Sequence, residues 1–167
     1  MIRFPARKTV FVFISLVLSS SAYAQVRSPE QLPEAFIKAW NSHDPTGKGF
    51  AAIFADDAHF VPYPEIPVVI GGKEISSGIG DLVGNNWAKD VDSAVKGTPL
   101  IHRLRPDVAA IYWHADLIRD GKPMEGIQRA IIFVAVRKGG EWRITDFQIT
   151  KENPDAPRPA PVARPAA

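Results

Sequence analysis

Two short turn sequences constrain the fold more than any other feature of this chain. Asp120-Gly121 and Gly139-Gly140 are typical of the two-residue turns that join antiparallel strands. Around them, β-branched and aromatic residues alternate with polar ones over residues 95–105, 108–118, 124–137 and 142–150. A period of two is the pattern of a half-buried strand. The second half of the chain is therefore predicted to form a curved antiparallel sheet.

The first half of the chain predicts helices. Ser28 fits an N-cap, Pro29 the first helical position and Gln31 the last position of a capping box. An apolar stripe at helical spacing follows, a shorter helix is expected near Phe50, and a third is expected over residues 72–83, weakened by internal glycines. The stripe consists of Leu32, Phe36, Ile37 and Trp40. The predicted class is α+β, with about three N-terminal helices packed on the sheet.

Both ends of the 167-residue chain differ in composition from the middle. Residues 1–24 have a basic start, an apolar stretch from Thr9 to Leu18 and the small-residue pattern Ala22-Tyr23-Ala24, which together predict a cleaved signal peptide. Residues 152–167 are rich in Pro and Ala and predict a disordered tail. One domain, residues 25–151, lies between them. We expect a periplasmic or secreted protein, without stable membrane anchoring because no cysteine could carry a lipid.

The charge of the chain argues against a nucleic-acid partner. Removing the predicted signal peptide takes away Arg3, Arg7 and Lys8, which lowers the formal charge of +2 by three, to −1. A near-neutral domain without a basic run lacks the positive surface that phosphate backbones require. We therefore expect no nucleic acid among its partners.

The two turns also predict which residues share a face of the sheet. Counting back from the turns places Trp113 opposite Gln128, and Ile132 opposite Phe147. One face then carries Ile111, Trp113, Gln128, Ala130, Ile132, Val134, Phe147 and Ile149. The other carries Tyr112, His114, Asp116, Arg129, Ile131, Phe133, Asp146 and Gln148. Neither face is simply polar, so we expect helices to cover one and a second copy of the chain to cover the other.

Four segments, in order, carry a family resemblance: Ala39-Trp40-Asn41-Ser42-His43-Asp44, Phe54-Ala55-Asp56-Asp57-Ala58-His59-Phe60-Val61, Arg105-Pro106-Asp107-Val108-Ala109 and Gly140-Glu141-Trp142-Arg143-Ile144. With them the chain resembles the SnoaL-like branch of the nuclear transport factor 2-like superfamily, and within it the SgcJ/EcaC-type proteins. The resemblance implies a cone-shaped fold with an internal pocket, commonly dimeric through the outer face of the sheet. The superfamily includes cyclases, isomerases, dehydratases and non-enzymatic binders, so the resemblance alone does not assign a function.

The ketosteroid isomerase branch of that superfamily provides a test of chemistry. Its mechanism needs an Asp base, a Tyr and a protonated Asp. The resemblance places Pro62, Phe36 and Ile132 at these positions. None of these side chains transfers a proton. The comparison implies that this isomerase chemistry is absent and that the face with Ile132, Phe147 and Ile149 looks into the pocket.

The predicted ligand pocket is largely apolar. Gln128 is its notable polar member, because an amide on an apolar wall needs a hydrogen-bond partner that a ligand or water could supply. Trp40 and Trp113 could equally be ordinary core residues. The full set is Phe36, Trp40, Phe60, Trp113, Gln128, Ile132, Phe147 and Ile149.

Few residues are candidates for catalysis, and whether the chain is an enzyme stays open. His59, His102 and Tyr63 could act as acids or bases, although each could equally be structural. Asp56 and Asp57 fit a turn before a strand. The spacing of His and acidic residues matches no metal site, and no cofactor-binding motif is present, so we expect neither metal nor cofactor.

The most polar set of side chains is expected on the outer face of the sheet. There, Arg129 could form ion pairs with Asp116 or Asp146 within or across a dimer interface. The predicted interface consists of Tyr112, His114, Asp116, Arg129, Asp146 and Gln148. If the two faces were exchanged, this set would line a polar catalytic pocket instead.

Three functions fit these observations. The first is an exported SnoaL-like protein that binds a small, largely apolar molecule in the cone, and it is favoured because the predicted inner wall is rich in aromatics and poor in acids and bases. The second is a cyclase, isomerase or dehydratase that uses His or Tyr acid–base chemistry. The third is a non-enzymatic module that binds another protein through the sheet or the tail.

Overall fold

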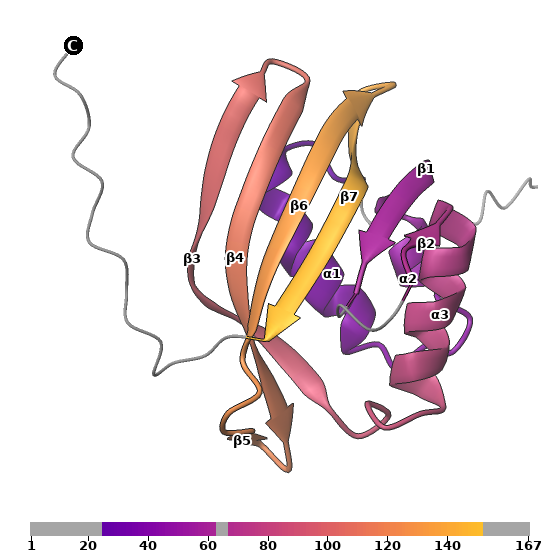
Figure 1. Ribbon diagram of the computed structural model, residues 1–167, viewed down its shortest axis with the longest axis vertical. Coiled ribbons are helices and arrows are strands. Elements are labelled where there is room, and N and C mark those ends of the chain that lie inside the picture. The colour runs from indigo at the N-terminus through magenta and orange to yellow at the C-terminus, as the bar shows by residue number, and fades with distance from the viewer. Residues whose placement is uncertain (1–24, 63–66, 152–167) are drawn as a thin grey trace, which may run out of the picture.

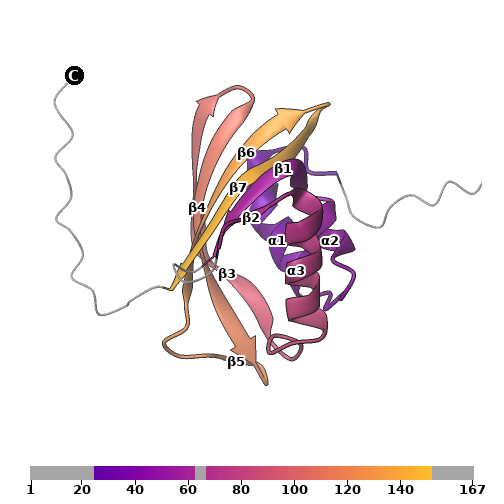
Figure 2. The same cartoon turned by 45° about the vertical axis from the view of Figure 1, so that its right-hand side comes forward.

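The computed structural model describes residues 25–62 and 67–151. The predicted signal peptide, the predicted tail and Tyr63 lie outside these residues. Helices α1 (Leu32–Trp40), α2 (Lys48–Ala51) and α3 (Gly72–Gly84) lie on one side of a single curved sheet, as Figures 1 and 2 show. A short 3₁₀ turn over Pro29–Gln31 precedes α1. The predicted α+β class with three helices on a curved sheet is confirmed.

The sheet has seven strands and is mixed rather than purely antiparallel. The order across it is β2 (Val69–Ile70), β1 (Phe54–Val61), β7 (Glu141–Lys151), β6 (Arg129–Lys138), β4 (Val108–Arg119) and β3 (Asp92–Arg105). Strand β5 (Lys122–Pro123) pairs with the end of β4. The pairing of β1 with β7 is parallel, and the other pairings are antiparallel.

The start of the first helix is as predicted. The Oε1 atom of Gln31 accepts hydrogen bonds from the backbone N–H groups of Ser28 and Arg27, at 3.1 and 2.8 Å. This is the Gln31 part of a capping box, which supplies an acceptor for N–H groups at the start of a helix. Asp56 and Asp57 differ from expectation: they lie inside β1, where its pairing with β7 is irregular, and not in a turn before it.

The predicted strand register holds at the turns and is wrong beyond them. Asp120 and Gly121 both have positive φ and join Arg119 to Lys122, as the turn sequence predicts. The chain then leaves the ladder near Gly126, and Trp113 pairs with Ile131 instead of Gln128. Any odd slip exchanges the two faces of a strand.

A bulge causes a second slip in the last hairpin. Lys138 pairs with Glu141 next to the turn as expected, but the register shifts at Thr145, between the Ala135 and Val134 pairs, so Phe147 pairs with Phe133 and not with Ile132. The two slips together invert β6 alone. Its buried residues are Ile131, Phe133 and Ala135, whereas Ile132 and Val134 are on the outer face and only half-buried.

The core lies between the helices and the concave face of the sheet. Phe36 of α1 is at its centre, with ring centroids 5.3 Å from both Phe50 and Phe147 and 5.6 Å from Phe133. Aromatic pairs at these distances, two of them edge to face and the Phe133 pair tilted, add stability beyond the burial of apolar area. Phe36 therefore joins α1, α2 and two strands.

Candidate functional site

A cavity of about 260 Å³ lies between α3 and the concave face of the sheet. Figure 2 shows α3 facing that side of the sheet. Apart from Glu74, Ser93 and Arg129, the lining consists of apolar residues and Gly78. Its lining residues are Phe36, Trp40, Phe60, Pro62, Val69, Glu74, Ile75, Gly78, Ile79, Leu82, Trp87, Ser93, Ala115, Leu117, Arg129, Ile131, Phe147 and Ile149. Such a surface favours an apolar ligand, because it offers few hydrogen bonds and much apolar area.

Glycines set the position of α3 against the rest of the fold. A Cβ atom on Gly80 would be 2.5 Å from the backbone N of Gly47, so only glycine lets the helix approach the loop before α2 this closely. Gly78, two residues earlier in the helix, has no such neighbour, because nothing lies within 4 Å of the position that its Cβ would occupy. Because Gly78 lines the cavity, its missing side chain leaves space there.

The far wall of the cavity is aromatic. Phe60 of β1 stacks on Phe147 of β7, with ring centroids 4.4 Å apart and planes inclined by 10°. Phe147 in turn meets Phe36 edge to face. Because close-packed interiors resist rearrangement, we expect this wall to be rigid.

The C-terminal end of α1 is tied to the first residues of β3. The indole N–H of Trp40 donates to the carbonyl oxygen of Val91 at 2.7 Å. The Asn41 side chain both donates to the carbonyl of Ser93 at 2.9 Å and accepts from its N–H at 2.8 Å. Trp40 and Ser93 both line the cavity, so these bonds hold two of its walls together.

His43 makes a further link beside this junction. Its Nδ1 lies 3.1 Å from the carbonyl oxygen of Val83, and its Nε2 lies 2.9 Å from Oδ1 of Asp92. Both partners are acceptors, so the ring satisfies both only as an imidazolium with two N–H groups. The hydrogen bond to Asp92 raises the pKa of His43 against the opposing effect of burial, and the Val83 carbonyl and the charges of Asp92 and Asp90 act in the same direction.

Most of the predicted pocket residues line the cavity, and three do not. Phe36, Trp40, Phe60, Phe147 and Ile149 are in the lining. Trp113 is 2% exposed, 5.9 Å from the Phe36 ring, and belongs to the core behind that wall. Gln128 and Ile132 are outside the lining, and for Ile132 the inverted β6 is the reason. The residue that lines the cavity in its place is Ile131, whose side chain likewise transfers no proton.

The polar groups of two predicted pocket residues, Trp113 and Gln128, lack hydrogen-bond partners among the described residues. The indole Nε1 of Trp113 and the amide Oε1 of Gln128 are buried and have no hydrogen-bond partner in the described structure. Such groups are uncommon in native proteins. Gln128 is not a lining residue of the cavity, so its role in a ligand pocket stays a prediction.

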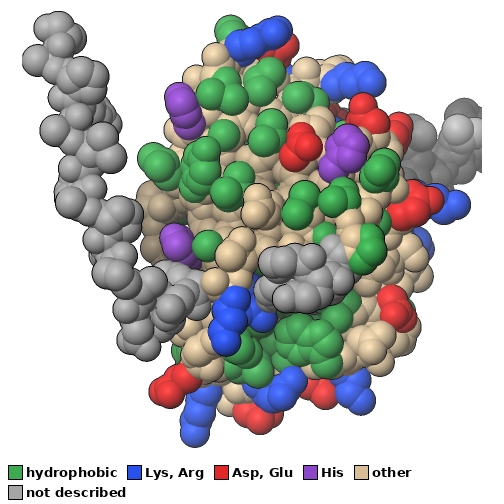
Figure 3. All heavy atoms as spheres, in the orientation of Figure 1, with side chains coloured by type: hydrophobic (Ala, Val, Ile, Leu, Met, Phe, Trp, Pro, Cys, Tyr) green, Lys and Arg blue, Asp and Glu red, His purple; other side chains and the backbone are tan. Residues whose placement is uncertain are grey.

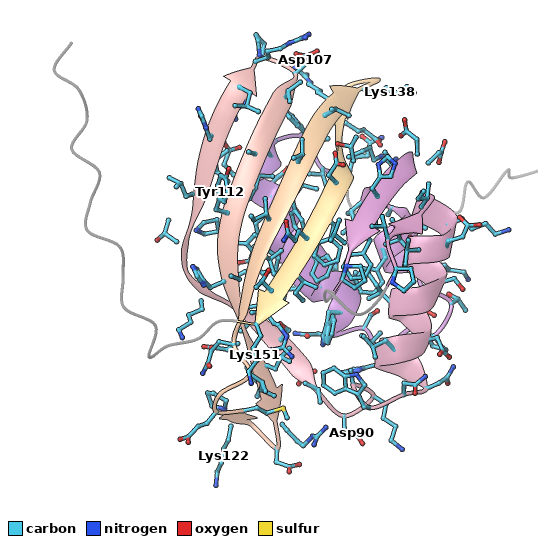
Figure 4. The ribbon with its side chains drawn as sticks, viewed as in Figure 1. Asp90, Asp107, Tyr112, Lys122, Lys138 and Lys151 are labelled. Carbon is cyan, nitrogen blue, oxygen red and sulfur yellow. The ribbon has the colours of Figure 1, made fainter. Side chains whose placement is uncertain are left out.

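The predicted interface residues lie on the outer face, with one exception. Tyr112, His114, Asp146 and Gln148 are exposed there and Asp116 is partly exposed. Figure 3 shows this face, with apolar side chains over much of the sheet, and Figure 4 labels Tyr112 projecting from it. Arg129 is instead on the inner face, where it lines the cavity.

The expected ion pairs of Arg129 are also corrected. Asp146 lies 3.6 Å from Nδ1 of His59, and Asp116 lies 3.6 Å from Nζ of Lys96. Arg129 Nη1 donates to the backbone carbonyls of Ile127 and Gln128, at 2.8 and 3.3 Å. The inversion of β6 accounts for this difference, because it turns Arg129 away from both aspartates.

The two histidine candidates for catalysis are not lining residues of the cavity. His59 is exposed on β1 beside Asp146, and His102 is exposed on β3; neither is a lining residue.

Across residues 25–62 and 67–151, no group of three His, Cys, Asp or Glu side chains could hold a metal ion. None of the helices in the described part of the chain is long and apolar enough to span a membrane.

Sequence analysis missed the α3 side of the cavity. Ile75, Ile79 and Leu82 recur at helical spacing and, with Gly78, form the lining face of this helix. That stripe could have been recognised as a face directed toward the sheet. Trp87, which is 50% exposed and also lines the cavity, carried no periodic signal because it follows the helix in a turn.

Comparisons with known proteins identify the fold. No protein-family model matches the chain, and neither does any curated protein. Among solved structures, a domain of unknown function with a cystatin-like fold from Nostoc punctiforme has a TM-score of 0.64 at 20% identity, over 74% of this chain and 75% of that one.

Two further structures agree. An uncharacterized protein with a cystatin-like fold from Caulobacter vibrioides has a TM-score of 0.62 at 24% identity, over 74% of this chain and 87% of that one. An NTF2-like protein with a cystatin-like fold from Novosphingobium aromaticivorans has a TM-score of 0.61 at 14% identity, over 76% of this chain and 83% of that one. At these identities the likeness concerns the fold alone. The chain has the NTF2-like, cystatin-like fold.

Proposed function

We propose that this protein binds a small, largely apolar molecule in the cavity under α3. The observation that carries the proposal is the lining itself, about 260 Å³ bounded mainly by aliphatic and aromatic side chains. Small-molecule sites are typically concave and apolar with a few polar groups that fix orientation. Glu74, Ser93 and Arg129 would supply those polar groups.

Binding is favoured over acid–base catalysis by the position of the histidines. His59 and His102 are exposed on strands and are not lining residues, so neither could act on a molecule in the cavity. We retain the SnoaL-like, SgcJ/EcaC-type assignment as part of the proposal, on the four sequence segments that carry it.

The test uses the cavity's own geometry. Gly78→Leu adds a Cβ that meets nothing within 4 Å and extends a larger side chain from a lining position, so it should fill the cavity without straining the helix. Native mass spectrometry of gently purified protein should find a retained small molecule in the wild type and lose it in this variant. Ser77→Leu, at an exposed position next in the same helix, is the matched control. Retention of the molecule in Gly78→Leu would refute the cavity as the site.

A second copy of the chain is the partner we propose for the outer face. Tyr112, Leu100 and Leu104 are 43%, 66% and 53% exposed, and this face is rich in apolar side chains (Figure 3). Exposed apolar patches on a sheet commonly mark an interaction site. Tyr112→Arg should convert a dimer to a monomer in sedimentation velocity, and a wild-type monomer would overturn the proposal.

We also propose that the protein is exported and cleaved near residue 24. N-terminal sequencing of the mature protein checks this proposal.

A further inference from the structure

We propose that the cavity takes an unbranched apolar chain, and that Trp87 sets the preferred chain length by covering the part of the ligand that extends past the C-terminal end of α3. The inference rests on the proposed function and specifies its ligand class and a residue that determines specificity. It starts from the shape of the cavity and from the position of Trp87 in its lining.

The cavity is long and narrow. Its lining residues on α3 run from Glu74 to Leu82, which is about 12 Å at 1.5 Å per residue. A volume of about 260 Å³ over that length gives a mean cross-section of roughly 20 Å². One extended hydrocarbon chain fills such a cross-section, whereas a fused ring system is wider. The shape therefore favours a chain.

Trp87 continues the apolar lining beyond the helix. It lies in the turn that leads from Gly84, the last residue of α3, toward β3, and Figure 4 labels Asp90 in the same turn. Of the exposed large apolar side chains in residues 25–62 and 67–151, Trp87 is the one that lines the cavity. It is 50% exposed, so a ligand that covers the indole gains by removing its apolar surface from water.

Hydrogen bonds fix the turn that carries Trp87. The carboxylate of Asp81 accepts from the side-chain amides of Asn85 and Asn86, at 3.0 and 2.8 Å. The backbone carbonyl of Trp87 accepts from Nη2 of Arg119 at 3.2 Å. A contact surface on a fixed segment loses little entropy when a ligand binds. None of these bonds involves the indole, so a substitution of Trp87 leaves them in place.

A series of neutral alcohols measures the length of the site. At roughly 30 Å³ for each water-sized group, about 260 Å³ accommodates on the order of ten non-hydrogen atoms. Octanol therefore fits within the cavity, and dodecanol extends beyond it. Decanol and decahydro-2-naphthol have the same number of carbon atoms, so this pair separates a chain from a fused ring.

Calorimetric titration of the full chain with each alcohol tests the proposal. The affinity should rise about fourfold for each methylene between hexanol and octanol, because the cavity buries each one fully. The rise should continue to dodecanol in smaller steps, because the added methylenes contact Trp87 on one side and water on the other. Decanol should bind more tightly than decahydro-2-naphthol.

The emission of Trp87 gives a second, optical readout. The chain has four tryptophans, and the other three, Trp40, Trp113 and Trp142, are buried. Dissolved iodide should therefore quench mainly the emission of Trp87. Dodecanol should protect this emission from iodide and shift it to shorter wavelength, whereas octanol should leave it accessible.

Variants assign the length preference to the indole. Trp87→Ala should reduce the affinity for dodecanol about tenfold and that for octanol by no more than about twofold. Trp87→Phe should restore most of the affinity for dodecanol, because a phenyl ring keeps an apolar surface there. Ile70→Ala is the matched control, because Ile70 is 64% exposed and is not a lining residue. Retained octanol binding also shows that Trp87→Ala remains folded.

The outcomes separate this inference from the proposed function. If octanol binds but dodecanol binds no more tightly, or leaves Trp87 open to iodide, the role of Trp87 is overturned and the apolar-binding cavity stands. Tighter binding of decahydro-2-naphthol than of decanol would overturn the chain as the ligand class. If no alcohol binds and mass spectrometry finds no retained molecule, the proposed function and the inference both fail.

Discussion

Two glycines in the same helix should respond in opposite ways to the same substitution. Gly78 and Gly80 both lie inside α3, where replacement of glycine by alanine stabilises a helix by about 1 kcal/mol. Their surroundings differ. A Cβ on Gly78 meets nothing within 4 Å, whereas a Cβ on Gly80 is 2.5 Å from the N and 2.7 Å from the Cα of Gly47.

The magnitudes follow from these contacts. Gly78→Ala should raise the free energy of unfolding by about 1 kcal/mol, since only the intrinsic helix propensity of the residue changes. Gly80→Ala must push α3 away from backbone atoms, which cannot rotate aside, at a cost of about 2–3 kcal/mol that outweighs the gain in helix propensity. The two variants should therefore differ by about 2–3 kcal/mol.

Thermal and urea denaturation followed by circular dichroism would measure this difference. At roughly 3–4 °C for each kcal/mol in a domain of this size, the melting temperatures of the two variants should be about 10 °C apart. Gly80→Ser, which adds the same Cβ, should behave like Gly80→Ala. If Gly80→Ala were as stable as Gly78→Ala, the close approach of α3 to Gly47 would not exist and the reasoning would be refuted.

Three further perturbations test the junctions around the cavity. Phe36→Ala should lower the free energy of unfolding by about 3–5 kcal/mol in urea denaturation, because it opens a space between α1, α2 and two strands, and a loss below 1 kcal/mol would contradict its central position. Asn41→Ala should cost about 1–3 kcal/mol, because the Ser93 backbone loses both partners, and Asn41→Asp should retain the bond from the Ser93 N–H. The raised pKa of His43 implies a contribution to stability that is complete below about pH 6.5 and is lost as the pH rises through the folded-state pKa. Solvent around Asp92 limits this contribution to about 1 kcal/mol, and His43→Gln should remove it from the stability profile measured between pH 5 and 9.

The architecture could be predicted from sequence because its signals are local. Gln31 marks the start of a helix, and Asp120-Gly121 and Gly139-Gly140 mark hairpins whose pairs next to the turn have the predicted register. Counting from the turns correctly grouped the residues that share a face of β4 and of β7, and the family resemblance indicated which of these faces looks inward. Each of these signals involves residues close together in the chain.

The errors arise where one residue changes the register without a local signal. The bulge at Thr145 has an ordinary strand sequence, so nothing near it predicts the shift. The other slip had a signal: Gly126, inside the strand predicted over residues 124–137, marks an interruption and has a positive φ. Because both slips involve β6, they placed Arg129 on the wrong face and concealed the cation that lines the cavity.

The parallel pairing of β1 with β7 also bears on how the chain folds. Phe54 pairs with Ile144 and Phe60 with Phe147, so a strand made early in synthesis has its neighbour among the last residues of the domain. Contacts between residues this far apart close long loops, and folds rich in them form slowly. The edge of β1 and the aromatic face of α1 must therefore stay uncovered until β7 emerges. During that interval a nascent chain would gain most from a chaperone that shields apolar surface.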